Sequence, residues 1–412
     1  MTALGALNRT TATSTSAPSQ QAETSIPARQ LTGANAPDLP QAASTGAWTP
    51  EQGVGERRFA SIGSLELESG TVLEDVTMAY ETWGTLDADG GNAILVLHAL
   101  TGDSHVRGGV SDAHPSPGWW EDVVGPGLPI DTERWFVIAP NILGGCQGST
   151  GPSSPAPDGR AWGSRFPVLT VRDQVAAERR LRDQLGIERW GLVIGGSMGG
   201  MRAVEWAVSH PEEVERLAVI ASSARATADQ IAWNSAQSAA IRVDPEFRGG
   251  DYYDVVGGQG PQLGLGIARR IAHTTYRTAT ELEARFGNRP QEGEDPFDGV
   301  GRHQITSYLD HHAGKLSRRF DANSYLVLAH SMSTHDVGRD RGGVPAALSR
   351  VSARTLVVAI DSDRLFPPAL VAEMAEHIPR STWQVAQSEI GHDAFLLAHP
   401  DLDGWIADLL DG

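Results

Sequence analysis

Five short runs of apolar residues constrain the fold of this 412-residue chain most strongly. Each run is apolar at nearly every position, which is typical of strands buried on both faces, as in a parallel sheet. Helical patterns at 171–186 and 198–214 alternate with some of these runs. The alternation predicts an α/β fold with a mostly parallel, doubly wound sheet. The runs are AILVLHAL (93–100), RWFVIAP (134–140), WGLVIGG (190–196), RLAVIASS (216–223) and RTLVVAID (354–361).

The interval between the last two runs is much longer than the others. No comparable strand pattern occurs between Ser223 and Arg354, and about 130 residues is too long for a loop. Helix-like patterns fill the interval, so we predict a helical insertion that forms a lid over one edge of the sheet. The predicted organisation is therefore a tail (1–52), a first part of the core (53–223), the lid (224–350) and a second part of the core (351–412).

The first 52 residues are rich in Ala, Ser, Thr, Gln and Pro and contain few large apolar side chains. Such a segment buries too little surface to offset its conformational entropy, so we expect it to be disordered. Order is expected to begin near Arg58. There, residues 59–70 and 72–84 have the pattern of two antiparallel strands around a Ser-Gly turn.

Charge and composition restrict the partners of the chain. A formal net charge of −18 argues against nucleic acid and anionic membranes as partners, although local arginines could still hold an anionic small molecule. No apolar run approaches the roughly 18 residues of a membrane span. The single cysteine, Cys146, excludes an intrachain disulfide framework and favours a reducing compartment, so we expect a cytoplasmic protein.

The segment LVIGGSMGGMRAVEWA places Ser197 between a strand and a helix. Gly-x-Ser-x-Gly alone is a weak signal in a chain with 46 glycines. The strand, tight turn and helix around it are the setting of a nucleophile elbow, in which the serine hydroxyl stands clear of the sheet. The helix N-terminus places positive potential where an oxyanion would form. We therefore interpret Ser197 as a candidate nucleophile.

A serine nucleophile needs a base, and the base needs a carboxylate to orient it. In the α/β-hydrolase fold these groups follow in the order Ser, acid, His. His392 follows the last strand pattern, and two aspartates, Asp361 and Asp363, compete for the acid. Asp361 has the position of a strand end, whereas Asp363 lies in the following loop, so Asp363 is favoured.

The oxyanion of an acyl transfer needs two N–H donors. One should come from the residue after the nucleophile and the other from the loop after the third strand of the core, which predicts the backbone amides of Met198 and Leu100. His98 and His105 of the same loop are interpreted as loop structure. No histidine pair has a zinc-like pattern with an acidic third ligand, so no metal site is predicted.

Nine segments, in order from about residue 57 to the C-terminus, closely resemble the homoserine O-acetyltransferase family of methionine biosynthesis. The resemblance implies an α/β-hydrolase fold with a helical lid, usually dimeric, that moves an acetyl group from acetyl-CoA to the side-chain hydroxyl of L-homoserine. It implies no bound cofactor, because acetyl-CoA is a co-substrate. The segments are HALTGDSH, NILGGCQGSTGP, GGSMGGMRAVEWA, ARATADQIAWNSAQ, ARRIAHTTYR, RFDANSYL, HDVGRDRGG, DSDRLFPP and GHDAFL.

Residue by residue, the resemblance makes Ser197 the nucleophile, Asp363 the acid and His392 the base. It makes Arg269 the partner of the homoserine carboxylate and Asp393 the partner of its amino group. An arginine fork matches a carboxylate, which agrees with the first of these two roles. Without the resemblance, Arg269 would be interpreted as an arginine on the lid surface.

Three rival functions remain open from the sequence. The same fold could use succinyl-CoA as the donor, or accept serine or another alcohol. It could also be an esterase, against which the pair Arg269 and Asp393 argues. A non-catalytic binding protein of this fold would not need a nucleophile, an acid and a base together.

Overall fold

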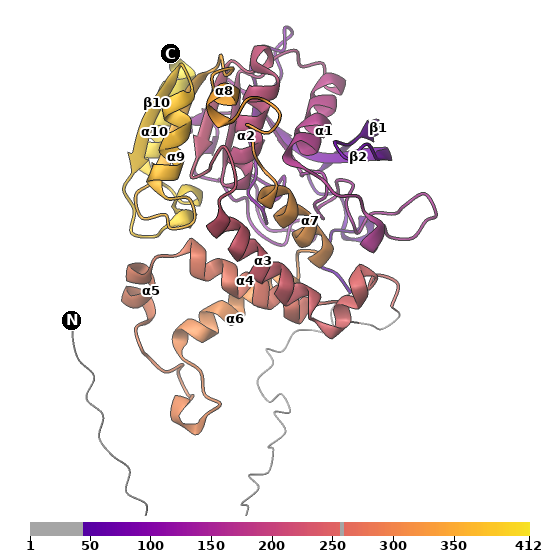
Figure 1. Cartoon of the computed structure of the whole chain (residues 1–412), viewed down its shortest axis with the longest axis vertical. Helices are drawn as coiled ribbons and strands as arrows, with labels where there is room; N and C mark the ends of the chain where they lie inside the picture. Colours follow the sequence, from indigo (N-terminus) through magenta and orange to yellow (C-terminus); the bar gives the residue numbers. More distant parts are fainter. Residues whose placement is uncertain (1–43, 256–258) are drawn as a thin grey trace, which may run out of the picture. The chain divides into compact units, whose positions relative to one another are not determined.

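An eight-stranded sheet forms the centre of the computed structural model, which describes residues 44–255 and 259–412 (Figure 1). Its order is β1-β2-β6-β3-β7-β8-β9-β10. β1, β2 and β6 pair antiparallel, and every pairing from β6 to β10 is parallel. The mostly parallel α/β sheet predicted from the apolar runs is confirmed. The strands are β1 Arg58–Glu66, β2 Val72–Trp83, β3 Ala93–Leu97, β6 Phe136–Pro140, β7 Leu192–Gly196, β8 Arg216–Ile220, β9 Arg354–Ile360 and β10 Ser381–Ala386, with β4 Val124–Gly125 and β5 Ile130–Asp131 in a separate pair.

Both faces of the sheet are buried, which explains why its strands are apolar at successive positions. In β3, Leu95 and Leu97 belong to one hydrophobic cluster, whereas Ile94 and Val96 belong to the other. Helices α1, α2 and α9 contribute to the first cluster and α10 to the second. These helices are α1 Val171–Gln184, α2 Met198–Ser209, α9 Pro368–His377 and α10 Pro400–Asp411.

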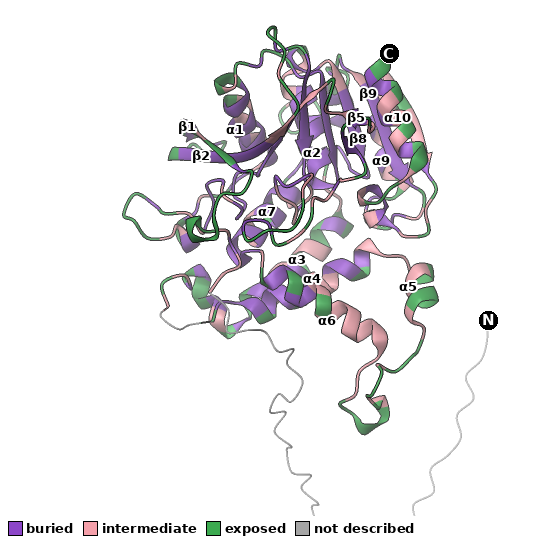
Figure 2. Ribbon diagram, turned by 180° about the vertical axis from the view of Figure 1, so that it is seen from behind, coloured by how far each residue is buried: buried purple, intermediate pink, exposed green. Residues whose placement is uncertain are grey.

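The long interval before β9 is helical, and it holds no strand among its described residues. Figure 1 shows α3, α4 and α6 gathered at one end of the sheet. Helix α4 packs against α3 closely, because a Cβ on Gly264 would lie 2.6 Å from the Ala240 carbonyl oxygen. Figure 2 shows that the strands are largely buried, whereas α5 is exposed or intermediate throughout and α6 over most of its length. The helices are α3 Ala228–Arg242, α4 Gln262–Tyr276, α5 Ala279–Phe286, α6 Gln304–Ser317, α7 Ala322–Ser333 and α8 Val344–Leu348.

Short 3-10 helices occupy several connections, and one of them, η6, begins at the candidate base. No helix of the described residues combines the length and apolar content that a bilayer crossing requires. The 3-10 helices are η1 Pro50–Gln52, η2 Gly163–Arg165, η3 Pro211–Glu213, η4 Pro245–Gly250, η5 Pro296–Asp298 and η6 His392–Leu396.

The prediction of a disordered tail was wrong for residues 44–52. Ala47 is buried, the Trp48 amide donates to the Cys146 carbonyl at 2.9 Å, and the Gly46 amide donates to the Phe320 carbonyl at 3.2 Å. Gly46 approaches so closely that a Cβ would lie 2.6 Å from the Arg319 backbone nitrogen. Backbone hydrogen bonds and a few side-chain contacts hold this segment, such as the packing of Trp48 on Phe59, so overall composition could not reveal it. The remainder of the predicted tail, 1–43, lies outside the described residues.

Candidate active site

Ser197 occupies the tight turn between the last residue of β7 and the first residue of α2. Its backbone has φ 55° and ψ −124°, a strained conformation for a residue with a Cβ. The flanking glycines make the turn possible. A Cβ on Gly195 would lie 2.4 Å from the Gly199 carbonyl carbon, and one on Gly199 would lie 2.0 Å from the Leu97 oxygen. The Ser197 amide donates to the Ile220 carbonyl at 3.0 Å, which anchors the turn to β8.

A hydrogen-bonded chain runs from Ser197 through His392 to Asp363. His392 Nε2 lies 2.9 Å from Ser197 Oγ, and His392 Nδ1 lies 2.6 Å from Asp363 Oδ2. The other carboxylate oxygen of Asp363 accepts the amides of Leu365 and Phe366 at 2.8 and 2.9 Å. The structure thus brings together the three residues that the sequence analysis selected from three distant segments.

Electrostatics assign the protons in this chain. Burial lowers the pKa of His392, but the charge and hydrogen bond of Asp363 outweigh burial, and the pKa is raised above 6.5. Burial raises the pKa of Asp363, but His392 and the two backbone amides outweigh it, and the pKa is lowered from 3.8. The ionised Asp363 only accepts hydrogen bonds, so Nδ1 of His392 carries the proton. In neutral His392, Nε2 is then free to accept the proton of Ser197.

Asp361, the alternative candidate for the acid, makes other contacts in the structure. β9 ends at Ile360, and the Asp361 amide donates to the Ala386 carbonyl of β10 at 3.0 Å. Its carboxylate accepts the Ser388 amide at 2.8 Å, which ties together the loops that follow β9 and β10. Asp363, two residues further along, makes the contact with His392.

The loop after β3 is braced against the first turn of α2. Arg202 of α2 donates to the His98 carbonyl at 2.7 Å. The His98 ring spans the same loop, because its Nε2 accepts the Ile142 amide at 3.1 Å and its Nδ1 lies 2.7 Å from the Ala99 carbonyl. Burial lowers the pKa of His98 to about 3, so the ring is neutral. These contacts hold the residue that follows them, Leu100, in the loop next to the helix that begins at Met198.

Two further charged residues from the sequence analysis lie near the site, one on the lid and one beside His392. Asp393 follows His392 directly in η6, and Arg269 lies in α4. Arg269 Nη1 donates to Thr101 Oγ1 at 3.2 Å, while its buried Nε has no hydrogen-bond partner. Its guanidinium lies 5.8 Å from the Tyr276 ring centre. Arg269 therefore points from the lid to the loop that carries Leu100, and it is not a surface arginine.

Two neighbouring arginines allow a comparison with Arg269. Arg270 pairs with Asp310 at 2.7 Å, and Arg277 pairs with Glu281 at 2.6 Å. Arg269 has no carboxylate within ion-pair distance in the described part of the chain. An anionic ligand would supply the partner that this half-buried guanidinium lacks.

Three side chains near the site were not found from the sequence. Arg319 Nη1 donates to the Thr101 carbonyl at 2.8 Å, and its buried Nε also lacks a partner. The Phe366 ring stacks on the His392 imidazole at 5.1 Å, and the Tyr276 ring lies 5.7 Å from it. All three residues belong to segments that the resemblance uses, RRF, HTTY and LFPP, but nothing in their local pattern distinguishes them from core residues.

The carboxylate of Asp393 is not free of neighbours. Its Oδ2 lies 3.5 Å from Arg277 Nη1. Burial raises the pKa of Asp393, against the lowering effect of His392, Arg269 and Arg277. Burial is the larger effect, so the pKa of Asp393 is raised from its usual value of 3.8.

Comparisons with known proteins agree with this geometry. The family model for the alpha/beta hydrolase fold matches residues 92–398. A homoserine O-acetyltransferase from Thermobifida fusca (strain YX) is 57% identical over 91% of this chain and 98% of its own length. One from Clavibacter michiganensis subsp. michiganensis (strain NCPPB 382) is 54% identical over 89% of this chain and 96% of its own length.

Solved structures with the same fold fall into two groups. Homoserine O-acetyltransferase from Bacillus anthracis matches with a TM-score of 0.77 and 26% identity, over 86% of this chain and 97% of that one. Esterase E22 matches with a TM-score of 0.79 and 28% identity, over 86% and 99%. An acetylester hydrolase from Corynebacterium glutamicum matches with a TM-score of 0.72 and 30% identity, over 88% and 98%.

Proposed function

Because the chain belongs to the homoserine O-acetyltransferase family, we propose that it transfers an acetyl group from acetyl-CoA to the hydroxyl of L-homoserine. The products are O-acetyl-L-homoserine and CoA. Two observations together carry the proposal. Ser197, His392 and Asp363 form a hydrogen-bonded chain. Arg269 contacts Thr101, in the loop that contains Leu100, and has no carboxylate partner among the described residues. The first feature supports acyl transfer, and the second supports an anionic acceptor.

The first half-reaction forms an acyl-enzyme. Ser197 Oγ attacks the thioester carbonyl while His392 Nε2 takes its proton. The amides of Leu100 and Met198 stabilise the oxyanion of the tetrahedral intermediate. When the intermediate collapses, the carbon–sulfur bond breaks and His392 gives its proton to the departing sulfur of CoA.

The second half-reaction transfers the acyl group to the alcohol. Homoserine binds with its carboxylate on Arg269 and its ammonium group on Asp393, which places its hydroxyl at His392. His392 takes the hydroxyl proton as the oxygen attacks the acyl carbonyl. It then returns the proton to Ser197 Oγ, and the ester leaves. The sequence is ping-pong, because CoA departs before homoserine reacts.

Transfer must outcompete hydrolysis, and burial of the site supports this. Ser197 is 6% exposed and His392 is 3% exposed under the lid. A buried acyl-serine meets little water, while Arg269 and Asp393 hold the acceptor next to it. Such positioning corresponds to effective molarities worth several kcal/mol.

An esterase is the second candidate, because two solved esterase structures share the fold at 28–30% identity. In that case water would replace homoserine in the second half-reaction. The reaction proposed here requires no bound cofactor or metal. The resemblance implies a homodimer, and we propose that state for the full chain, to be tested by native mass spectrometry.

A donor and acceptor panel tests the proposed function. The purified full chain is given acetyl-CoA or succinyl-CoA with L-homoserine or L-serine, and CoA release and ester products are measured. We expect the largest kcat/KM for acetyl-CoA with L-homoserine. A larger kcat/KM with succinyl-CoA would change the proposed donor, and a larger kcat/KM with L-serine would change the proposed acceptor. CoA release at the same rate without any amino acid would favour the esterase.

A further inference from the structure

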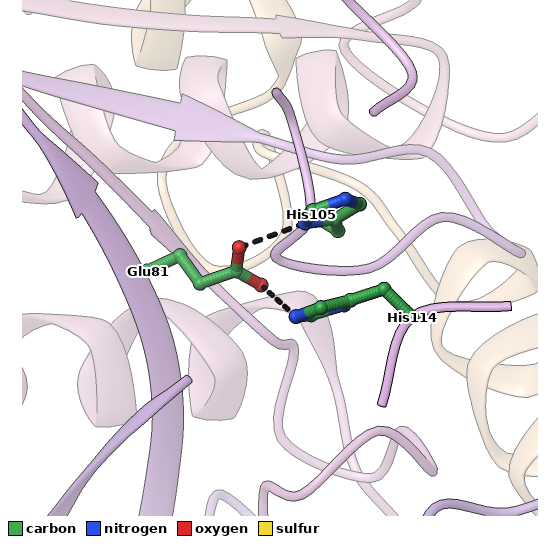
Figure 3. Close-up of side chains that lie close together, drawn as sticks. All are labelled: Glu81, His105 and His114. Carbon is green, nitrogen blue, oxygen red and sulfur yellow. Dashed lines mark hydrogen bonds and ion pairs between the residues drawn. The ribbon is translucent and has the colours of Figure 1, made fainter. Parts of the chain in front are cut away.

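Glu81, His105 and His114 form a buried cluster away from the hydrogen-bonded chain of Ser197. Glu81 lies on β2, and the two histidines lie in the connection between β3 and β4. Their side chains are 0%, 4% and 3% exposed. Figure 3 shows both imidazole rings turned toward the carboxylate of Glu81.

The distances within this cluster suit a small cation. His105 Nδ1 lies 2.9 Å from Glu81 Oε2, and His114 Nε2 lies 3.8 Å from Glu81 Oε1. One donor atom of each residue lies within 4.8 Å of the other two. Zinc–ligand bonds near 2.0–2.2 Å in a tetrahedron separate ligand atoms by roughly 3.3–3.6 Å, which is close to the spacing found here. The two imidazoles are stacked at an interplanar angle of 12°, so one ring must turn out of the stack for both lone pairs to reach the same ion.

The hydrogen bonds of His105 call for a positive charge at its Nδ1. Its Nε2 faces the Gly109 carbonyl at 3.3 Å, and its Nδ1 faces the Glu81 carboxylate at 2.9 Å. Both partners are acceptors, so a neutral ring can satisfy only one of them. Either the ring is an imidazolium, or Nε2–H donates to Gly109 while Nδ1 binds a cation. The second arrangement is the usual one for a metal-ligating histidine.

His114 provides the second, independent observation. Both ring nitrogens are buried, and neither has a hydrogen-bond partner. The ring stacks on His105 with centroids 3.8 Å apart and an interplanar angle of 12°. An unpartnered polar side chain in such a place lacks a ligand.

We propose that Glu81, His105 and His114 bind one divalent cation of the zinc type, with water in the fourth position. Two imidazoles and a carboxylate are ligands that Zn²⁺ accepts. Ser104 Oγ donates to Glu81 Oε1 at 2.7 Å and orients the carboxylate. The nearby guanidinium of Arg57 opposes a dication, and it is held by the Ala113 carbonyl and the Gln147 side chain.

The cation would have a structural role. It would join β2 to the connection that follows β3 and contains Leu100, and so fix the loop whose amide we assign to the oxyanion. No step of acyl transfer passes through it. The site escapes sequence reasoning because Glu81 lies 24 residues from His105, and the two histidines have no zinc-like spacing.

Zinc binding to the full chain tests the proposal. The chain is stripped with a chelator and dialysed against Zn²⁺, and its metal content and thermal unfolding are measured. We expect one Zn²⁺ per chain and a higher Tm with the metal. His114→Gln should bind Zn²⁺ roughly 10- to 100-fold more weakly, and its Tm should not respond. His210→Ala is the control, because Glu213 beside His210 is already paired with Arg179 at 2.6 Å.

Each possible result of these measurements either supports the zinc site or overturns it. Zn²⁺ content that is equal in wild type and His114→Gln overturns the proposal, as does a loss caused by His210→Ala. If His114→Gln does not fold, Co²⁺ titration of the wild type decides instead. Intense visible absorption of a tetrahedral nitrogen-ligated Co²⁺ supports the site, and the weak spectrum of the hydrated ion overturns it.

Discussion

The sheet core and the outer part of the helical lid, from α5 to α6, are held together by different forces. Every residue of β3 and β7 is buried. By contrast, α5 has no buried residue, and only four of the 14 residues of α6 are buried. This outer part of the lid instead uses partly exposed ion pairs, such as that of Arg302 with Glu294, whereas α4 and α7 contribute buried side chains to the core. Apolar burial on two faces gives a stiff frame, whereas exposed ion pairs contribute little and are screened by salt.

This difference suggests that the core and the lid have separate functions. The groups proposed for acyl chemistry, Ser197, Asp363 and His392, stand at ends of core strands, where a misplacement of about 1 Å would be costly. The group proposed to select the acceptor, Arg269, stands on the lid. A family that shares the core could therefore change its acceptor through the lid, which agrees with the presence of esterases among the similar structures.

The largest expected effect falls on the core. Ser197→Ala removes the proposed nucleophile, and turnover should drop on the order of 10⁵- to 10⁶-fold. Thermal unfolding should stay near wild type, because the side chain makes one hydrogen bond, to His392. Mass spectrometry after incubation with acetyl-CoA should find an acetyl adduct on the wild type alone. Substantial transfer by the alanine variant would exclude the covalent mechanism.

The second prediction compares substitutions of two aspartates in the core, Asp363 and Asp361. Asp363→Asn should lower kcat about 10⁴-fold, because the amide no longer fixes the required tautomer of His392. Asp361→Asn should have a much smaller effect, since its carboxylate only accepts the Ser388 amide. Steady-state kinetics of both variants provide the measurement. The reverse order would mean that the contact seen with His392 does not serve catalysis.

The pH dependence of acylation should report the raised pKa of His392. The base must be neutral, so kcat/KM for acetyl-CoA should fall as the pH drops below that pKa, which lies above 6.5. Asp393 adds negative charge beside the ring and raises its pKa further. Asp393→Asn should therefore move the acid limb down by up to about one pH unit. A limb that moves upward would contradict the assignment.

The smallest expected effect concerns the N-terminal segment. Removal of residues 1–52 eliminates the bonds of Gly46 and Trp48, and it should cost a few kcal/mol of stability and lower Tm by several degrees. Removal of residues 1–43 is the matched control and should leave Tm unchanged. Differential scanning calorimetry compares the two. Equal Tm values for both deletions would show that the contacts of residues 44–52 add nothing.

The sequence was sufficient to predict the structural features that produce a periodic or local pattern of residues. The strands appear as apolar runs because both sheet faces are buried, and the elbow of Ser197 appears because its glycines are required sterically. Asp363 was separable from Asp361 because strand ends and loops differ in composition.

Other features leave no such pattern. Residues 44–52 are held largely through backbone hydrogen bonds, which any residue can make, together with contacts of Thr45 and Trp48 to distant segments. The cluster of Glu81, His105 and His114 depends on β2 pairing with β6, which brings distant segments together. The different surroundings of Arg269 and Arg270 become apparent only when the lid is folded.

The division between core and lid is tested most directly by the two half-reactions of Arg269→Ala. Pre-steady-state CoA release reports acylation, and turnover with L-homoserine reports transfer. We expect near-normal CoA release and a transfer step about 10- to 100-fold slower, because a hydrogen bond to a charged group is lost. Arg270→Ala, whose arginine pairs with Asp310, should affect neither step. An equal fall of both steps in Arg269→Ala, or no fall in either, would contradict the account.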